Sequence, residues 1–166
     1  MPSSEADSAR FRAARDPRFK KVLVVDDITY VVRSIGRILE AEGYFVLTAK
    51  TGQEALDKFA DYSPDLITVD QKLPDMTGLQ LVGRIRRRSE GAKAKIVFIS
   101  GVTDKSEIQS ILLEEIDGYL VKPFKKARLI ETVRALVKLH DPPAPSDDES
   151  LPDLEDISGE DTSEDW

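Results

Sequence analysis

Five short apolar runs, separated by longer stretches of helical period, constrain the fold of this chain more than any other feature. The runs cover residues 22–25, 44–48, 66–69, 96–99 and 119–121. Four of the five are nearly continuous in hydrophobic residues, a pattern that is typical of strands buried on both faces of a parallel sheet. The runs therefore predict a parallel sheet that is covered on both sides.

The stretches between the runs place apolar residues three and four positions apart, as helices with one buried face do. The first of them stops at Gly43, a residue suited to the left-handed conformation that follows a helix end. The predicted helices cover residues 28–42, 53–60, 78–88, 104–115 and 125–139. This alternation predicts a doubly wound α/β domain with right-handed crossovers, whose functional site lies at the carboxyl ends of the strands.

Polar residues stand at four of those strand ends: Asp26 and Asp27, Asp70, Ser100, and Lys122. Three close carboxylates repel one another, and a hard divalent cation such as Mg²⁺ compensates the repulsion. With a lysine and a hydroxyl nearby, the set contains the parts needed to hold a phosphoryl group and a carboxylate to accept it. Any one of these residues alone could be an ordinary loop residue that faces water.

The composition excludes several other kinds of chemistry. The 166 residues include no Cys and a single His, His140, so disulfides, thiolate zinc sites and a Cys nucleophile are impossible. No apolar run is long enough to cross a membrane, and the N-terminus contains no secretory signal, so we expect a cytoplasmic location.

Four motifs carry a resemblance to a known family. They are Val-Val-Asp-Asp at 24–27, Val-Asp-Gln-Lys-Leu-Pro-Asp-Met-Thr-Gly at 69–78, Phe-Ile-Ser-Gly at 98–101 and Tyr-Leu-Val-Lys-Pro-Phe at 119–124. In order and spacing they resemble the receiver domain of two-component response regulators, over residues 20–140. The resemblance implies a flavodoxin-like sheet of five parallel strands in the order 2-1-3-4-5, flanked by five helices.

The resemblance also implies roles for the acidic residues. Asp70 would accept the phosphoryl group and help to bind Mg²⁺. Asp27 would bind Mg²⁺ directly and Asp26 mainly through water, with the backbone carbonyl of Lys72 as a further ligand.

The remaining motif residues would form the switch. Ser100 would move toward the aspartyl phosphate, Lys122 would be its counter-ion, and Tyr119 would change rotamer together with Ser100. The Lys122–Pro123 peptide bond would be cis, as X-Pro bonds can be.

The expected function is that of a stand-alone receiver, for which a histidine kinase or a histidine phosphotransfer protein supplies the phosphoryl group. Its output would be protein contact through residues 104–115, 119–121 and 125–139, without DNA binding. Such a chain is a self-phosphorylating phosphoacceptor rather than a turnover enzyme. Two alternatives stay open: a constitutive binding scaffold, and a phosphatase with an aspartyl-phosphate intermediate, which would want Asp-x-Asp where this chain has adjacent acids.

Three departures suggest finer properties. Gly101 leaves the mouth of the site open, which predicts labelling by small phosphodonors such as acetyl phosphate. Lys72 and Val102 stand where they could displace the hydrolytic water and prolong the phosphorylated lifetime, although Lys72 could also be a solvated surface lysine. Four arginines stand at the end of the third predicted helix: Arg84, Arg86, Arg87 and Arg88. They either complement the helix dipole or, as the more specific alternative, bind nucleic acid.

The first 18 residues are polar and predict a disordered leader. An amphipathic mitochondrial targeting helix is the poorer alternative, because Glu5, Asp7 and Asp16 interrupt its positive charge.

Residues 141–166 predict a disordered acidic tail that follows a proline-rich linker. They hold eleven acidic residues and no basic one, whereas residues 19–140, the predicted receiver domain, have a formal charge of +3 within a chain total of −7. The tail is either a solubilising segment or a docking segment for a basic, partly hydrophobic groove on a partner or on this chain. Its apolar anchors would be Leu151, Leu154, Ile157 and Trp166.

Overall fold

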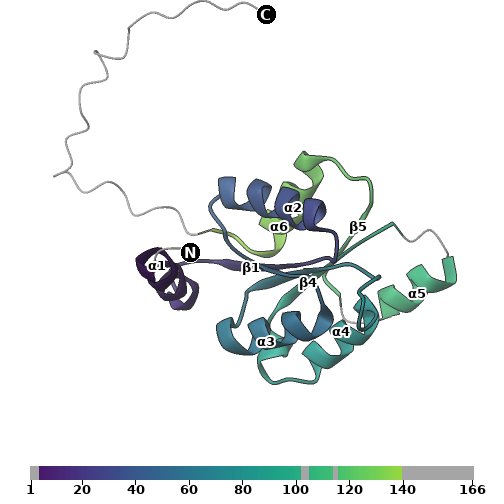
Figure 1. The fold of residues 1–166 in the computed structure, drawn as a ribbon. Coiled ribbons are helices and arrows are strands. Elements are labelled where there is room, and N and C mark those ends of the chain that lie inside the picture. The colour runs from purple at the N-terminus through teal and green to yellow at the C-terminus, as the bar shows by residue number, and fades with distance from the viewer. Residues whose placement is uncertain (1–3, 102–104, 114–115, 140–166) are drawn as a thin grey trace, which may run out of the picture.

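Five parallel strands form one sheet in the order β2-β1-β3-β4-β5, as predicted (Figure 1). The structure is a computed structural model and describes residues 4–101, 105–113 and 116–139. The strands are β1 (Lys21–Val25), β2 (Phe45–Ala49), β3 (Leu66–Val69), β4 (Lys95–Ser100) and β5 (Gly118–Val121). β1 pairs with both β2 and β3, so the chain reverses its direction of winding beside β1 and opens a crevice there.

Helices cover both faces of the sheet (Figure 1). α2 (Thr29–Ala41) and α6 (Lys126–Leu136) lie on one face, and α3 (Gly52–Tyr62), α4 (Gly78–Arg86) and α5 (Lys105–Leu113) lie on the other. A short 3₁₀ helix, η1 (Glu90–Ala92), follows α4. The five predicted helices are confirmed with shifted ends, and part of the predicted stretch 104–115 lies outside the described residues.

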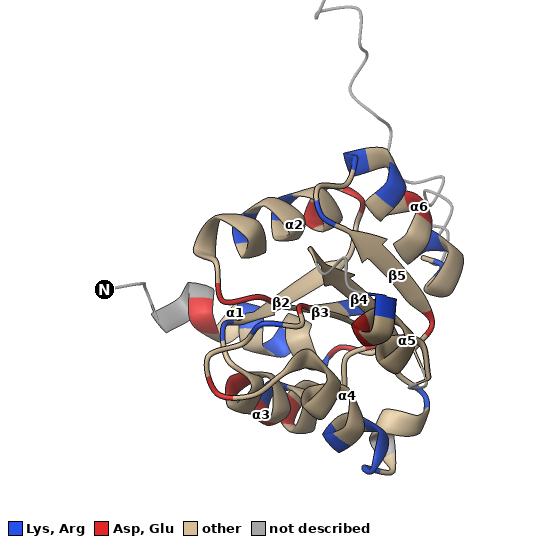
Figure 2. Ribbon diagram, turned by 90° about the vertical axis from the view of Figure 1, so that its right-hand side faces the viewer, with Lys and Arg blue, Asp and Glu red and all other residues tan. Residues whose placement is uncertain are grey.

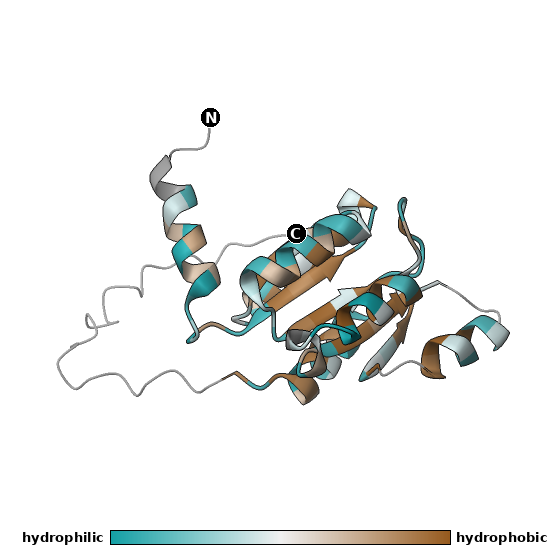
Figure 3. Cartoon of the chain, turned by 90° about the horizontal axis from the view of Figure 1, so that it is seen from below, coloured by the Kyte–Doolittle hydropathy of each residue, from teal (hydrophilic) through white to brown (hydrophobic). Residues whose placement is uncertain are grey.

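The continuous apolar runs are explained by burial on both faces. In β1, Val22 and Val24 pack with α2 and α6, whereas Leu23 and Val25 pack with α3 and α4. Figure 3 shows the strands as brown, hydrophobic ribbons, while the helices alternate between teal and brown. Strands of this kind have no solvent-facing side, which is why they lack the in–out alternation of an exposed sheet.

A sixth helix, α1 (Ser4–Arg15), lies in the segment that the sequence predicted as a disordered leader. Its Ala14 is 2% exposed, and the Phe11 ring stacks on Tyr62 of α3 with centroids 6.4 Å apart. The Arg10 guanidinium donates to the Val46 carbonyl of β2, over a distance of 3.3 Å. The predicted disorder is therefore wrong for this part, because contacts with the body supply the burial that the segment lacks by itself.

The ends of several helices carry residues that are typical of helix caps. Gly43 has φ +103°, so the left-handed position expected after α2 is confirmed. The Thr51 hydroxyl accepts a hydrogen bond from the Glu54 backbone at the start of α3. Thr77 and Gln80 form a reciprocal capping box at the start of α4. These caps fix where α3 and α4 begin at the carboxyl edge of the sheet.

Candidate functional site

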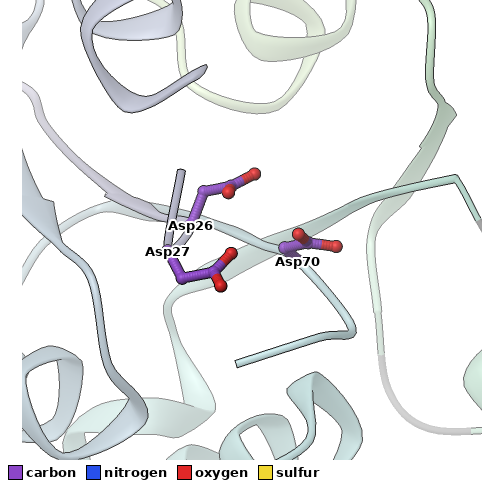
Figure 4. Close-up of side chains that lie close together, drawn as sticks. All are labelled: Asp26, Asp27 and Asp70. Carbon is purple, nitrogen blue, oxygen red and sulfur yellow. The ribbon is translucent and has the colours of Figure 1, made fainter. Parts of the chain in front are cut away.

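Three aspartates meet at the carboxyl edge of the sheet (Figure 4). Asp26 follows β1 and its backbone N–H donates to the Ala49 carbonyl of β2, while Asp70 follows β3 and donates likewise to the Val25 carbonyl, both over 3.1 Å. Sheet hydrogen bonds thus continue up to the acids and hold their backbones in place. One carboxylate oxygen from each of Asp26, Asp27 and Asp70 lies within 4.8 Å of the others. The structure therefore brings together the acids that the sequence placed there.

Lys122 provides the positive charge beside this cluster. Its Nζ lies 2.6 Å from Oδ2 of Asp26 and 3.3 Å from Oδ2 of Asp70. The side chain of Asp26 is 4% exposed and that of Asp70 is 10% exposed. The ammonium thus bridges two buried carboxylates and is closer to Asp26, a pairing that the sequence motifs did not indicate.

The electrostatics of the acceptor carboxyl reflect its burial. Burial raises the pKa of Asp70 above its ordinary value, and the charge of Asp26 adds to this, while Lys122 and a hydrogen bond from the Lys72 backbone oppose it. For Lys122, burial lowers the pKa, but hydrogen bonding and charge attraction from Asp26 and Asp70 outweigh it, so the pKa is raised overall. The pocket therefore disfavours further negative charge and keeps its lysine protonated.

Ser100 and Tyr119 lie on the adjacent strands β4 and β5. Ser100 ends β4, is 1% exposed, and its carbonyl accepts a hydrogen bond from the Lys122 backbone N–H over 3.0 Å. The Tyr119 ring is partly buried and stacks on Phe98 with centroids 6.3 Å apart and planes 3° apart. Burial, and then the charge of Glu107, raises the pKa of the Tyr119 hydroxyl. Ser100 thus lies on the strand next to the acceptor strand and Tyr119 on the strand beyond it, and their movement stays a prediction.

The loop after Asp70 closes tightly over the strand end. Lys72 pairs with Thr77 in an isolated antiparallel bridge, and the Gly78 N–H donates to the Gln71 carbonyl over 2.9 Å. A Cβ atom at Gly78 would lie 2.4 Å from the Asp70 carbonyl oxygen, so only glycine fits there. The Lys72 side chain is exposed. This agrees both with a role in displacing the hydrolytic water and with a solvated surface lysine.

The mouth of the site is open at Gly101. An added Cβ there would meet no atom of the described residues within 4 Å. Val102, which was predicted to act with Lys72, lies outside the described residues. The Lys122–Pro123 peptide bond is cis, as the resemblance implied.

Gln71 is a further residue of the site region, and the sequence motifs did not single it out. Its side chain accepts from the Leu79 backbone of α4 over 3.1 Å and donates to Glu107 of α5 over 2.9 Å. It is 7% exposed and directly follows Asp70. No local signal distinguishes this bridge between the acceptor strand and two helices, because Gln71 stands between the polar residues Asp70 and Lys72.

The basic residues at the end of α4 have structural partners. Arg86 forms an ion pair with Asp117 over 3.1 Å and donates to the carbonyls of Gly91 and Ala94, each over 2.7 Å. Arg88 donates to the Leu56 carbonyl over 3.4 Å. Two of the four predicted basic residues therefore bind the body of the domain as well as complementing the helix dipole.

The donor set fits a hard divalent cation. Carboxylate oxygens are the ligands that Mg²⁺ prefers, and three acids set against one lysine leave an excess of negative charge that such an ion neutralises. Asp26, Asp27 and Asp70 would supply the side-chain ligands.

Residues 22–134 match the family model of the response regulator receiver domain, so the chain belongs to this family. Phosphorylation and Mg²⁺ dependence are general features of these domains, and this chain has an acidic pocket formed by Asp26, Asp27 and Asp70. In the part of the chain that the structure describes, no helix is long and apolar enough to cross a membrane.

Individual relatives agree with this assignment. The chain is 35% identical over 121 residues to the chemotaxis protein CheY of Treponema pallidum, covering 71% of this chain and 83% of that protein. The chemotaxis response regulator CheY4 of Vibrio cholerae superimposes with a TM-score of 0.68 at 32% identity, covering 72% of this chain and 99% of that one. TrrA of Thermotoga maritima, solved in complex with Mg²⁺ and BeF, gives 0.64 at 34% identity, covering 72% of this chain and 100% of that one. The chain spans only about half the length of the transcriptional regulatory proteins that it also matches.

Proposed function

We propose that this chain accepts a phosphoryl group on Asp70 from a histidine kinase or a histidine phosphotransfer protein, in a reaction that depends on Mg²⁺. The observation that carries the proposal is the convergence of Asp26, Asp27 and Asp70 with Lys122 in one pocket. When bound, Mg²⁺ supplies positive charge that neutralises phosphoryl oxygens. Lys122 would hold a further phosphoryl oxygen after leaving Asp26, and Ser100 would donate a hydrogen bond from its hydroxyl to the phosphoryl group.

The output would be contact with a protein partner through α5, β5 and α6. Leu112 and Leu113 of α5 are 56% and 86% exposed, and Val121 at the end of β5 is 47% exposed. Exposed apolar side chains of this kind are suited to a protein interface. The Gln71–Glu107 hydrogen bond links the acceptor strand to α5, so a change at Asp70 can alter the position of this helix. A stand-alone role, absence of DNA binding and a cytoplasmic location stay predictions.

Mass spectrometry of the intact chain tests the phosphorylation. With acetyl phosphate and Mg²⁺ we expect a gain of about 80 Da, the mass of one phosphoryl group, that hydroxylamine removes. EDTA and D70A should each abolish the gain, whereas D61A, which removes an exposed aspartate of α3, should keep it. Labelling that persists in D70A, or is missing in the folded wild type, contradicts the proposal.

Partner binding separates the switch from the scaffold alternative. A switch binds its partner differently before and after phosphorylation, whereas a constitutive scaffold binds equally in both states. Equal binding by a chain that is fully phosphorylated on Asp70 would favour the scaffold.

A further inference from the structure

An apolar groove lies between α2 and the segment that leads into α6. It has a volume of about 540 Å³ and is lined by Tyr30, Val31, Ser34, Ile35, Ile38, Lys122, Pro123, Phe124 and Lys126. Six of these nine residues are apolar or aromatic, and Tyr30 is 79% exposed. Such a concentration of apolar side chains on an open surface marks a place where another chain segment can pack.

The charged residues at the rim of the groove are basic. Lys126 is exposed and, among the described residues, forms no ion pair, and neither does the exposed Lys125 next to it. Lys122 closes one end of the groove while it holds Asp26 and Asp70. Figure 2 shows basic residues where α6 begins, close to α2. An acidic segment with apolar side chains therefore matches both the lining and the rim.

The chain itself contains such a segment. Residues 141–166 hold eleven acidic residues and no basic one, and Leu151, Leu154 and Ile157 recur within them at intervals of three. We propose that residues 151–157 of the acidic tail dock into the groove between α2 and α6, with these three side chains against the apolar lining and the neighbouring carboxylates near Lys125 and Lys126.

The linker is long enough for this contact. α6 ends at Leu136 and the groove lies at its beginning, ten residues earlier, which is about 15 Å along a helix. Residue 151 comes twelve residues after Leu139, the last described residue before the tail, and a proline-rich chain of that length spans about 37 Å. A tethered segment also has an effective local concentration in the millimolar range, so a weak contact suffices.

Solution NMR of the full chain tests the contact, with methyl groups and backbone amides as probes. The variant L151A/L154A/I157A changes only the tail and leaves the residues of the folded domain intact. Compared with wild type, it should shift the methyl signals of Val31, Ile35 and Ile38 and the amide of Lys126. The control S158A/T162A/S163A alters the same tail without removing an anchor and should leave those signals in place.

Charge reversal tests the electrostatic attraction between the tail and the lysines of the groove. K126E should reproduce the shifts of the anchor variant, and it is compatible with the fold because an acidic residue is favourable in the first turn of a helix. The control K93E carries the same charge change at the end of η1, beside helices on the opposite face of the sheet, and should reproduce none. In wild type, 1 M salt should move the groove signals toward those of the variants, because it shortens the screening length to about 3 Å.

Three results would overturn the proposal. The first is that the NMR signals of the groove are identical in wild type and in the anchor variant. The second is that the signals that shift belong only to α5 and β5, or only to α1 and β2. The third is that the shifts vanish on dilution, which would assign the tail to a second copy. The experiment needs no phosphoryl group, so its failure leaves the proposed acceptor role of Asp70 untouched, and the reverse also holds.

Discussion

Similar charged residues serve different purposes at the two edges of the sheet. At the amino edge, the Asp65 carboxylate accepts from the Lys21 backbone N–H over 2.8 Å, and the Lys21 ammonium donates to the Tyr62 carbonyl over 2.6 Å. Asp117 accepts from the Ile96 backbone over 2.8 Å and pairs with Arg86 over 3.1 Å. Asp65 and Asp117 thus fasten the start of one strand to the segment that precedes the neighbouring strand.

The carboxyl edge is not balanced in this way. Three aspartates share one lysine there, and Asp27 is exposed. Like charges held together lower stability unless a cation joins them. Acids at a strand end therefore do not by themselves mark the site; the excess of acids over their positively charged or hydrogen-bonding partners does. Three substitutions, measured by urea unfolding with EDTA and with Mg²⁺, test the contrast.

The largest effect is expected from K122M. It leaves Asp26, whose side chain is 4% exposed, without its cation and Asp70 without its counter-charge. Removing one partner of a buried pair costs about 3 kcal/mol of unfolding free energy in EDTA. Mg²⁺ should restore part of the loss, because the ion replaces the missing charge. K93M removes an exposed lysine at the end of η1 and serves as the control, and equal stability of the two variants would contradict the contrast.

A smaller loss is expected from R86A at the other edge. It breaks the ion pair with Asp117 and the bonds to the Gly91 and Ala94 carbonyls, a loss of about 2 kcal/mol. Here Mg²⁺ should stabilise the variant as much as the wild type and no more. R87A, which truncates an exposed neighbour, should cost much less. A selective rescue of R86A by Mg²⁺ would show that the two edges are not independent.

The smallest effect, of opposite sign, is expected from D27N. It removes one of three like charges, so the unfolding free energy in EDTA should rise by about 0.5 kcal/mol. The stabilisation by Mg²⁺ should shrink at the same time, because a ligand is lost. D65N at the amino edge should instead destabilise, since its carboxylate accepts a backbone N–H. A D27N chain that is less stable than wild type without metal would refute the idea of an uncompensated pocket.

The order of strands and the position of the site were predictable because both follow from local signals. Runs such as 22–25 are apolar on both faces, and Asp70 and Lys122 directly follow strands whose ends must meet. The preference of Lys122 for Asp26 over Asp70 was not predictable, because it depends on tenths of an ångström between side chains from distant segments.

The N-terminal helix could not be predicted for a different reason. Apart from Met1, residues 1–18 contain a single large apolar side chain, Phe11, and no local pattern strong enough to form a helix alone. What orders the segment lies elsewhere in the chain: Phe45 and Tyr62 receive the Arg10 and Arg15 guanidinium groups at 5.9 and 5.5 Å from their ring centres. The hydrogen bonds of Gln71 could not be predicted for the same reason, because its partners lie on α4 and α5, away from it in the sequence.

The position of α1 also bears on how copies of this chain behave in a crowded solution. β2 is the outermost strand on its side, and an outermost strand offers backbone groups to which a foreign strand can add, the route by which many β-structures aggregate. Arg10 takes the Val46 carbonyl of that strand, and the helix that carries it lies against β2. By covering part of this edge, α1 is expected to hinder strand addition at this side of the sheet.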